Sequence, residues 1–271
     1  MQQSILLTLT FLASALFSVT AEEVSKPINK VCPYSGEDID AEQVVTYTKV
    51  VGVCCDKCKA KLQDKPGKHN EKESQGGFSI YVPEYYDPDV SYPLIMALHG
   101  GSGHGREFIW TWLREARSRG AILIAPTALG GTWSLMEPEA DSENIARMVA
   151  FAQEQWNIDP ARLLLTGMSD GGTFTYVSGL QSASPFTHLA PISASFHPLL
   201  LEMMDAGRIK DLPIYLTHGA LDWMFPIDVA RSARQALSAA GADLRYREIE
   251  DLSHTYPSDE NQHILDWFLP A

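Results

Sequence analysis

Apolar runs alternate with amphipathic segments from about residue 78 to the end of the chain. Seven runs are rich in aliphatic residues and bounded by Gly, Pro or polar residues, which is typical of buried strands. They are 79–82, 93–100, 121–128, 162–167, 189–195, 213–219 and 244–249. In 142–156, between two of these runs, apolar residues recur on one helical face. Further helices are expected at 106–119, 171–180, 226–240 and 258–269. Such alternation predicts an α/β fold, with helices covering both faces of a mostly parallel sheet.

The first residues follow the pattern of a secretory signal peptide. An apolar run from Ile5 to Val19 is followed by Ala21, and Val19 and Ala21 are the small residues expected before a cleavage site. The alternative is a membrane anchor, but the run is shorter than the roughly 20 apolar residues that a spanning helix needs. We therefore expect a secreted or periplasmic protein with no membrane span in its mature chain.

Charge divides the rest of the chain into two parts. The formal net charge is −13, which argues against a nucleic-acid partner. Residues 22–76 carry nine Lys, no Arg and all four Cys, whereas residues 77–271 carry one Lys and eleven Arg. This change of composition indicates two units. We predict a signal peptide (1–21), a small cysteine-rich domain (22–70), a linker (71–77) and a catalytic domain (78–271).

The motif Gly167-Met168-Ser169-Asp170-Gly171 lies between a predicted strand and a predicted helix. A sharp turn there exposes the Ser169 hydroxyl, and small flanking residues let neighbouring backbone segments pass close by. The helix that starts at this turn directs its unpaired N–H groups and the positive end of its dipole at developing negative charge. Ser169 is therefore the candidate nucleophile.

Three further segments complete the candidate site. The loop 99–103 follows a strand and is rich in glycine, so the N–H groups of Gly101 and Asp170 are expected to form an oxyanion hole. Asp222 and His254 each follow a later strand, giving the order Ser, Asp, His of a catalytic triad. Other residues compete for these two roles. Asp228 and Asp251 are the alternative acids, and His99, His218 and His263 are the alternative bases. We interpret His99 and His218 as structural residues that hydrogen-bond the loops.

The motifs LHGGSG (98–103), NIDPARLLLTGMSDGG (157–172), HGALDWMFP (218–226) and LSH (252–254) together resemble the compact secreted esterases of the α/β-hydrolase superfamily. These include the phospholipase/carboxylesterase group and relatives of polyhydroxybutyrate depolymerase and feruloyl esterase. The resemblance implies a small-molecule or polymer-derived ester as substrate and no cofactor for catalysis. Four residues are candidate walls of the substrate pocket, with core packing as the alternative for each: Trp133, Met168, Phe196 and Trp223.

The cysteines Cys32, Cys54, Cys55 and Cys58 support two interpretations. Disulfides suit an exported chain, but adjacent cysteines do not easily bond each other. Closely spaced thiolates can also bind one soft cation, which would stabilise so small a unit. Residues 31–68 resemble the TRASH and YHS metal-binding domains, and this resemblance implies Cys32, Cys54 and Cys58 as ligands of zinc or another soft metal. Cys55 would be a fourth ligand or a redox partner.

Carboxylic ester hydrolysis through an acyl-enzyme is the leading functional prediction. A serine peptidase is the second, because the same triad attacks amides. A metal-responsive binding protein with a hydrolase scaffold is the third, and the intact triad argues against it. Oligomeric state is not predicted by any feature of the sequence.

Overall fold

The computed structural model describes residues 38–46, 50–53, 56, 68–70 and 75–270. The predicted signal peptide and all four cysteines lie outside the described residues, so the two predictions made for them stay predictions. Among the described residues, no helix is long and apolar enough to cross a membrane. The same residues contain no cluster of three or more His, Cys, Asp or Glu side chains placed to hold a metal ion.

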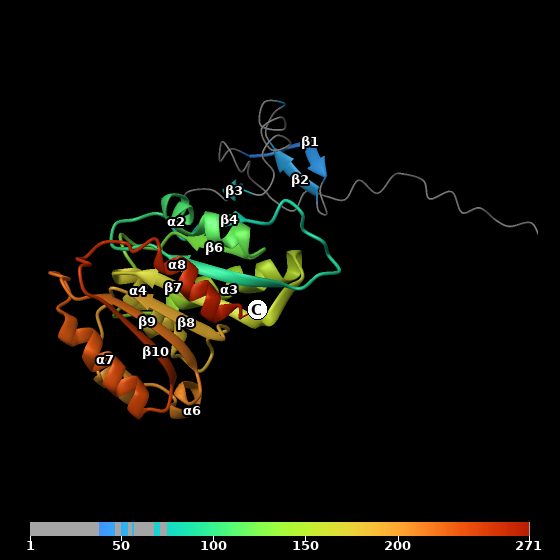
Figure 1. The fold of residues 1–271 in the computed structure, drawn as a ribbon. Helices are drawn as coiled ribbons and strands as arrows, with labels where there is room; N and C mark the ends of the chain where they lie inside the picture. Colours follow the sequence, from blue (N-terminus) through green and yellow to red (C-terminus); the bar gives the residue numbers. More distant parts are fainter. Residues whose placement is uncertain (1–37, 47–49, 54–55, 57–67, 71–74, 271) are drawn as a thin grey trace, which may run out of the picture.

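An eight-stranded sheet forms the centre of the molecule, with the order β10-β9-β8-β7-β5-β6-β4-β3 (Figure 1). Its strands are β3 (Lys68–Asn70), β4 (Phe78–Tyr81), β5 (Tyr92–Leu98), β6 (Ile122–Pro126), β7 (Ile158–Met168), β8 (His188–Ile192), β9 (Pro213–Gly219) and β10 (Asp243–Ile249). The strands from β10 to β6 run parallel, and β4 and β3 each pair antiparallel with their neighbours. The predicted α/β fold with a mostly parallel sheet is therefore confirmed, because the seven predicted runs correspond to β4 through β10.

The two faces of the sheet are covered by different helices. The helices are α2 (Gly105–Ser118), α3 (Glu139–Gln155), α4 (Asp170–Gly179), α5 (Leu199–Glu202), α6 (Ala206–Ile209), α7 (Ile227–Ala239) and α8 (Glu260–Phe268). Leu94, Met96 and Leu98 of β5 pack in a core with α3, α4 and α7. Ile95 and Ala97 point to the other face and pack with α2 and α8. This two-residue alternation along one buried strand explains why β5 is apolar throughout.

Residues 38–53 contain a separate antiparallel pair, β1 (Asp40–Thr46) and β2 (Val50–Val53). The large sheet also begins earlier than predicted. Residues 68–70 were assigned to the cysteine-rich domain, but as β3 they pair with β4 through Lys68–Tyr81, His69–Ile80 and Asn70–Ser79. The predicted domain boundaries stay predictions, and the strand itself was missed because a three-residue edge strand without an apolar pattern carries no sequence signal.

The end of the predicted linker is also fixed to the catalytic domain. The Gly76 N–H donates to the Thr127 carbonyl at 3.1 Å, and the Asn144 side chain donates to the Gly76 carbonyl at 3.0 Å. The Thr127 N–H donates to the carbonyl of Gly77 at 2.7 Å. Residues 76 and 77 thus extend the pairing of β4 with β6.

We predict that a chain starting at Gln75 folds cooperatively although it lacks β3. The loss of a few edge-strand hydrogen bonds, each worth about 0.5–1.5 kcal/mol, should lower its Tm by about 2–6 °C relative to a chain starting at Glu22. A matched chain starting at Ile80 lacks the Gly76 and Gly77 contacts and half of β4, and should show no cooperative transition. Thermal unfolding followed by circular dichroism distinguishes the three. If the chain starting at Gln75 also fails to unfold cooperatively, the upstream segment belongs to the catalytic fold.

Candidate active site

Ser169 occupies a sharp turn between β7 and α4. Its backbone has φ 57° and ψ −121°, a conformation that side-chain-bearing residues rarely adopt and that stores strain. Two glycines make this turn possible. A Cβ atom at Gly167 would lie 2.5 Å from the Gly171 carbonyl, and one at Gly171 would lie 2.4 Å from the His99 oxygen. Only glycine at both positions allows β7, α4 and the end of β5 to approach this closely.

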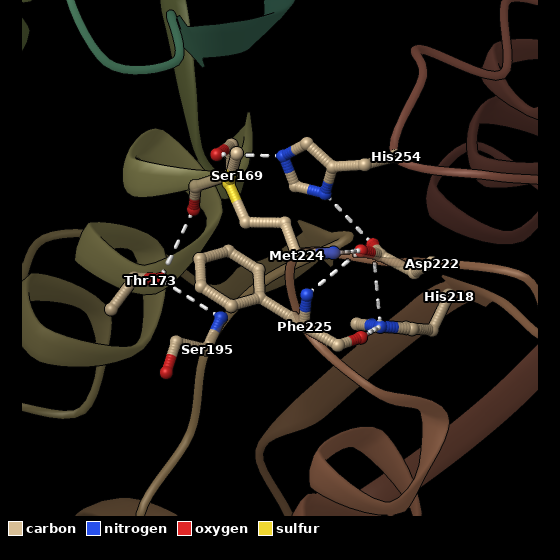
Figure 2. A network of polar contacts seen from close by, with 8 residues as sticks. All are labelled: Ser169, Thr173, Ser195, His218, Asp222, Met224, Phe225 and His254. Carbon is tan, nitrogen blue, oxygen red and sulfur yellow. Dashed lines mark hydrogen bonds and ion pairs between the residues drawn. The ribbon is translucent and has the colours of Figure 1, made fainter.

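A chain of hydrogen bonds joins the side chains of Ser169, His254 and Asp222 (Figure 2). The Ser169 Oγ and His254 Nε2 atoms are 3.0 Å apart, and His254 Nδ1 is 2.8 Å from Asp222 Oδ2. An ionised carboxylate only accepts hydrogen bonds, so it fixes the proton on Nδ1 and leaves Nε2 free to accept the serine proton. The Asp222 side chain is fully buried and that of His254 is 8% exposed. Low exposure keeps competing water away from these hydrogen bonds.

The acid is held by its own loop, which follows β9. Asp222 Oδ1 accepts hydrogen bonds from the backbone N–H groups of Met224 at 2.9 Å and Phe225 at 2.8 Å. The buried His218 Nε2 lies 2.8 Å from the Phe225 carbonyl and 3.5 Å from Asp222 Oδ2. His218 therefore hydrogen-bonds the same loop through the Phe225 carbonyl (Figure 2). The buried carboxylate thus has a partner on each oxygen, as a buried charge requires.

The competing acids lie elsewhere. Asp228 is in the first turn of α7, its side chain is 87% exposed, and it pairs with Arg231. Asp251 is exposed on the loop after β10. The acid that contacts the His254 imidazole is Asp222. His263 is an exposed residue within α8.

The glycine-rich loop after β5 runs alongside the serine. A Cβ atom at Gly100 would lie 3.5 Å from Ser169 Cβ, and one at Gly101 would lie 2.8 Å from Asp170 Oδ2. Asp170 is the first residue of α4, so its N–H has no partner within the helix and lies at the positive end of the helix dipole. The structure thus places the Asp170 side chain beside Gly101, and both residues were predicted to supply oxyanion donors.

His99 fixes the start of that loop. Its Nε2 accepts the Ala128 N–H at 3.1 Å, so its proton resides on Nδ1, which donates to the Gly100 carbonyl at 2.6 Å. Burial lowers the pKa of the His99 imidazole and keeps it neutral, as this arrangement demands. The Trp133 indole donates to the His99 carbonyl at 2.8 Å. His99 therefore connects the oxyanion loop to the loop that follows β6.

The four candidate pocket residues have different environments. Trp133 is 2% exposed and stacks on Phe174, and Phe196 is 8% exposed and packs edge-on against Tyr176, so both belong to the core. Met168 is partly buried and packs against the core cluster that contains Ile95 and Ala97. Trp223 is 73% exposed, and its ring lies 6.2 Å from that of His254.

Some residues of the site were not anticipated from the sequence. Phe225 packs edge-on against the His254 ring at 5.3 Å, on the same loop as Trp223. The Thr173 hydroxyl donates to the Ser169 carbonyl at 3.1 Å and accepts the Ser195 N–H at 3.0 Å, so it joins α4 to the loop after β8 (Figure 2). Phe225 lies within the motif 218–226, so the sequence could have indicated that it belongs to the site. Nothing in the sequence marks Thr173.

The chain has the α/β-hydrolase fold, and comparisons with known proteins agree with this assignment. Residues 137–269 match the phospholipase/carboxylesterase family. Esterase PE8 superposes with a TM-score of 0.59 at 22% identity, covering 72% of this chain and 99% of that one. A ferulic acid esterase superposes with a TM-score of 0.60 at 15% identity, covering 71% of this chain and 91% of that one.

Two curated relatives are similar in sequence. Feruloyl esterase C of Emericella nidulans is 29% identical over 159 residues, which are 56% of this chain and 56% of that protein. A bifunctional acetylxylan esterase/xylanase of Neocallimastix patriciarum is 28% identical over 158 residues, which are 56% of this chain and 22% of that protein. The similarity thus spans about half the length of the first relative and less of the second.

Proposed function

We propose that this protein is a serine hydrolase that cleaves carboxylic esters through an acyl-enzyme. The observation that carries the proposal is the continuous hydrogen-bonded chain from Ser169 Oγ through His254 to the buried Asp222. The position of Ser169 on a strained strand-to-helix turn supports the same activity. The esterases among its sequence relatives support an ester substrate over the amide substrate of a peptidase.

The proposed reaction has two halves. Ser169 Oγ attacks the ester carbonyl carbon while its proton passes to His254 Nε2, and the carbonyl oxygen becomes an oxyanion facing the N–H groups of Gly101 and Asp170. When the tetrahedral intermediate collapses, His254 gives that proton to the departing alcohol and the acyl group stays on Ser169. Water then attacks the acyl-enzyme as His254 accepts a water proton. Collapse of the second intermediate releases the acid and returns the proton to Ser169.

The loop that carries Asp222, residues 220–226, is called the acid loop below. Its exposed apolar side chains favour esters that carry an apolar or aromatic group. Leu221 is 61%, Trp223 73% and Met224 45% exposed, beside the base and acid. An exposed indole next to a reacting centre offers a flat face on which an aromatic ring can stack. Feruloyl esterase C, one of the relatives, is named for an aromatic acyl group. We therefore propose hydroxycinnamoyl esters as substrates.

Two proposals rest on sequence pattern alone. The apolar run 5–19 supports export of the chain. The spacing of Cys32, Cys54, Cys55 and Cys58 supports a soft-metal site in the N-terminal segment.

We predict that a fluorophosphonate probe forms an adduct with Ser169, because an activated hydroxyl attacks phosphorus as it attacks a carbonyl carbon. Peptide mass spectrometry of the folded protein locates the adduct. Ser169→Ala should abolish labelling and lower kcat for a p-nitrophenyl ester by about three or more orders of magnitude. Absence of an adduct at Ser169 in folded wild-type protein would refute the proposed nucleophile.

A second prediction separates the three candidate acids. Asp222→Asn keeps the side-chain shape but no longer fixes the proton on His254 Nδ1, so kcat should fall by about 10³- to 10⁴-fold. Asp228→Asn and Asp251→Asn are matched controls on exposed positions and should retain wild-type kcat. Steady-state rates on the same ester test this, and a slow Asp228→Asn or Asp251→Asn beside an active Asp222→Asn would show that the acid is wrongly assigned.

We also predict that Trp223→Ala raises KM for methyl ferulate by about 2- to 10-fold, the value of one lost aromatic stacking contact. KM for methyl acetate should stay the same, because that ester has no ring to stack. Trp110→Ala, on α2, removes another exposed indole as the control. Equal changes for both esters would exclude Trp223 as an aromatic platform without affecting the proposed ester hydrolysis.

A further inference from the structure

A segment outside the predicted site motifs contacts the oxyanion side of the site at several points. This segment, residues 128–133, follows β6 and is called the β6 loop below. It donates the Ala128 N–H to His99 Nε2 at 3.1 Å and the Trp133 indole N–H to the His99 carbonyl at 2.8 Å. The Gly131 carbonyl accepts the Ser102 N–H at 3.1 Å. The β6 loop thus holds the oxyanion loop 99–103 at both ends.

The β6 loop also reaches the nucleophile helix through one side chain. The Thr132 hydroxyl donates to Asp170 Oδ2 at 2.6 Å, a short bond of the kind made to an ionised acceptor. The same carboxylate oxygen lies against Gly101, where an added Cβ would come within 2.8 Å of it. One carboxylate oxygen therefore contacts both the β6 loop and the oxyanion loop, from the residue directly after Ser169.

The charge of Asp170 makes this contact important. The side chain belongs to the residue whose N–H is proposed to stabilise the oxyanion, so a carboxylate lies close to the place where negative charge develops. Like charges at short range oppose each other, and a charge-assisted hydrogen bond favours one fixed orientation of the carboxylate. Fixed dipoles stabilise a transition state best when they need not reorganise during the reaction.

We propose that Thr132 is a positioning residue for ester hydrolysis, acting through Asp170. Its hydroxyl holds the Asp170 carboxylate in one orientation beside Gly101, which fixes the spacing of the two oxyanion donors and keeps the carboxylate from reorienting as the oxyanion forms. This inference rests on the proposed ester hydrolysis and adds a residue to it.

Loss of the Thr132 hydroxyl should act on the transition state and leave substrate binding unchanged. Without a donor, the Asp170 carboxylate is free to rotate, and the oxyanion forms beside an unrestrained negative charge. An interaction made only in the transition state lowers kcat and kcat/KM equally when it is lost. Removal of a whole oxyanion donor costs about 10²- to 10³-fold, so an indirect effect of about 10- to 100-fold is expected.

The test compares Thr132→Val, which removes the hydroxyl at constant shape, with Thr132→Ser, which keeps it. Thr132→Ala serves as a second hydroxyl-free variant if the valine protein does not fold. Thr111→Val is the matched control, because it removes a threonine hydroxyl that donates to the Phe108 carbonyl within α2. For each protein, kcat, KM for p-nitrophenyl acetate and Tm are measured.

Inhibition by an alkyl trifluoromethyl ketone provides a direct probe of the oxyanion. Ser169 Oγ adds to its carbonyl carbon, the serine proton moves to His254 Nε2, and the carbonyl oxygen becomes an oxyanion with no leaving group. We expect Thr132→Val to lose about 10- to 100-fold in kcat and in affinity for this ketone, with unchanged KM. Thr132→Ser and Thr111→Val should behave like the wild type.

Three results would overturn the inference: unchanged kcat and ketone affinity in the hydroxyl-free variants, a rise in KM that accounts for the whole loss, or equal loss in Thr132→Ser. Each leaves ester hydrolysis by the wild type intact. A wild-type protein that neither hydrolyses the ester nor binds the ketone would instead refute the proposed function itself.

Discussion

The parallel pairing of β5 with β7 is the constraint on which the rest of the site depends. Its register places Leu98 beside Gly167, so the two strands end side by side. The glycine-rich loop 99–103 and the turn at Ser169 therefore start from adjacent points. The close contact between Gly171 and the His99 carbonyl is possible only because Gly171 has no Cβ atom, which would overlap the His99 carbonyl oxygen. A larger residue at 167 or 171 would separate the strand ends and with them the serine from the oxyanion loop.

A second requirement is the accommodation of a buried negative charge. Asp222 is shielded from water, so its carboxylate must find hydrogen bonds inside the protein. Two come from backbone N–H groups of the loop that carries it, and one comes from His254. The loop therefore folds around the acid it presents, and the position of the acid fixes the orientation of the imidazole. This is why residues far apart in the chain meet with hydrogen-bonding geometry.

Much of the fold could be predicted because the sheet is buried on both faces. The strands from β5 to β9 contain apolar runs, and each run is followed by a turn or a helix that the sequence marks with Gly, Pro or polar residues. The edge strand β10 instead alternates exposed and partly buried residues. Helix α3 could be predicted because its apolar residues recur on one helical face, which is buried. The edge strand β3 escaped prediction because its three residues, Lys68–Asn70, are polar and gain their conformation only by pairing with β4. The short helices α5 and α6 also lack enough residues for a periodic pattern.

The candidate site was predictable where a local motif specifies it and not where contacts form through space. The turn at Ser169 has a local signature, but Thr132 reaches Asp170 from a loop on the other side of β5 and has none. Trp133 was a candidate pocket wall with core packing as its alternative, and the sequence could not show that its buried indole donates to the His99 carbonyl.

The proposed catalytic groups and the proposed specificity residues lie in different parts of the same loops. In the proposed mechanism His254 transfers protons and Asp222 orients it, and both are buried at the base of these loops, with side chains 8% and 0% exposed. The apolar residues of the same acid loop stand in solvent at its outer side, with Trp223 73% exposed. Substitution of a buried group disturbs hydrogen bonds that the fold requires, whereas substitution of an exposed side chain disturbs little of the core. The outer positions can therefore vary to suit different esters while the proton-transfer geometry stays constant, as expected of a fold that carries many activities.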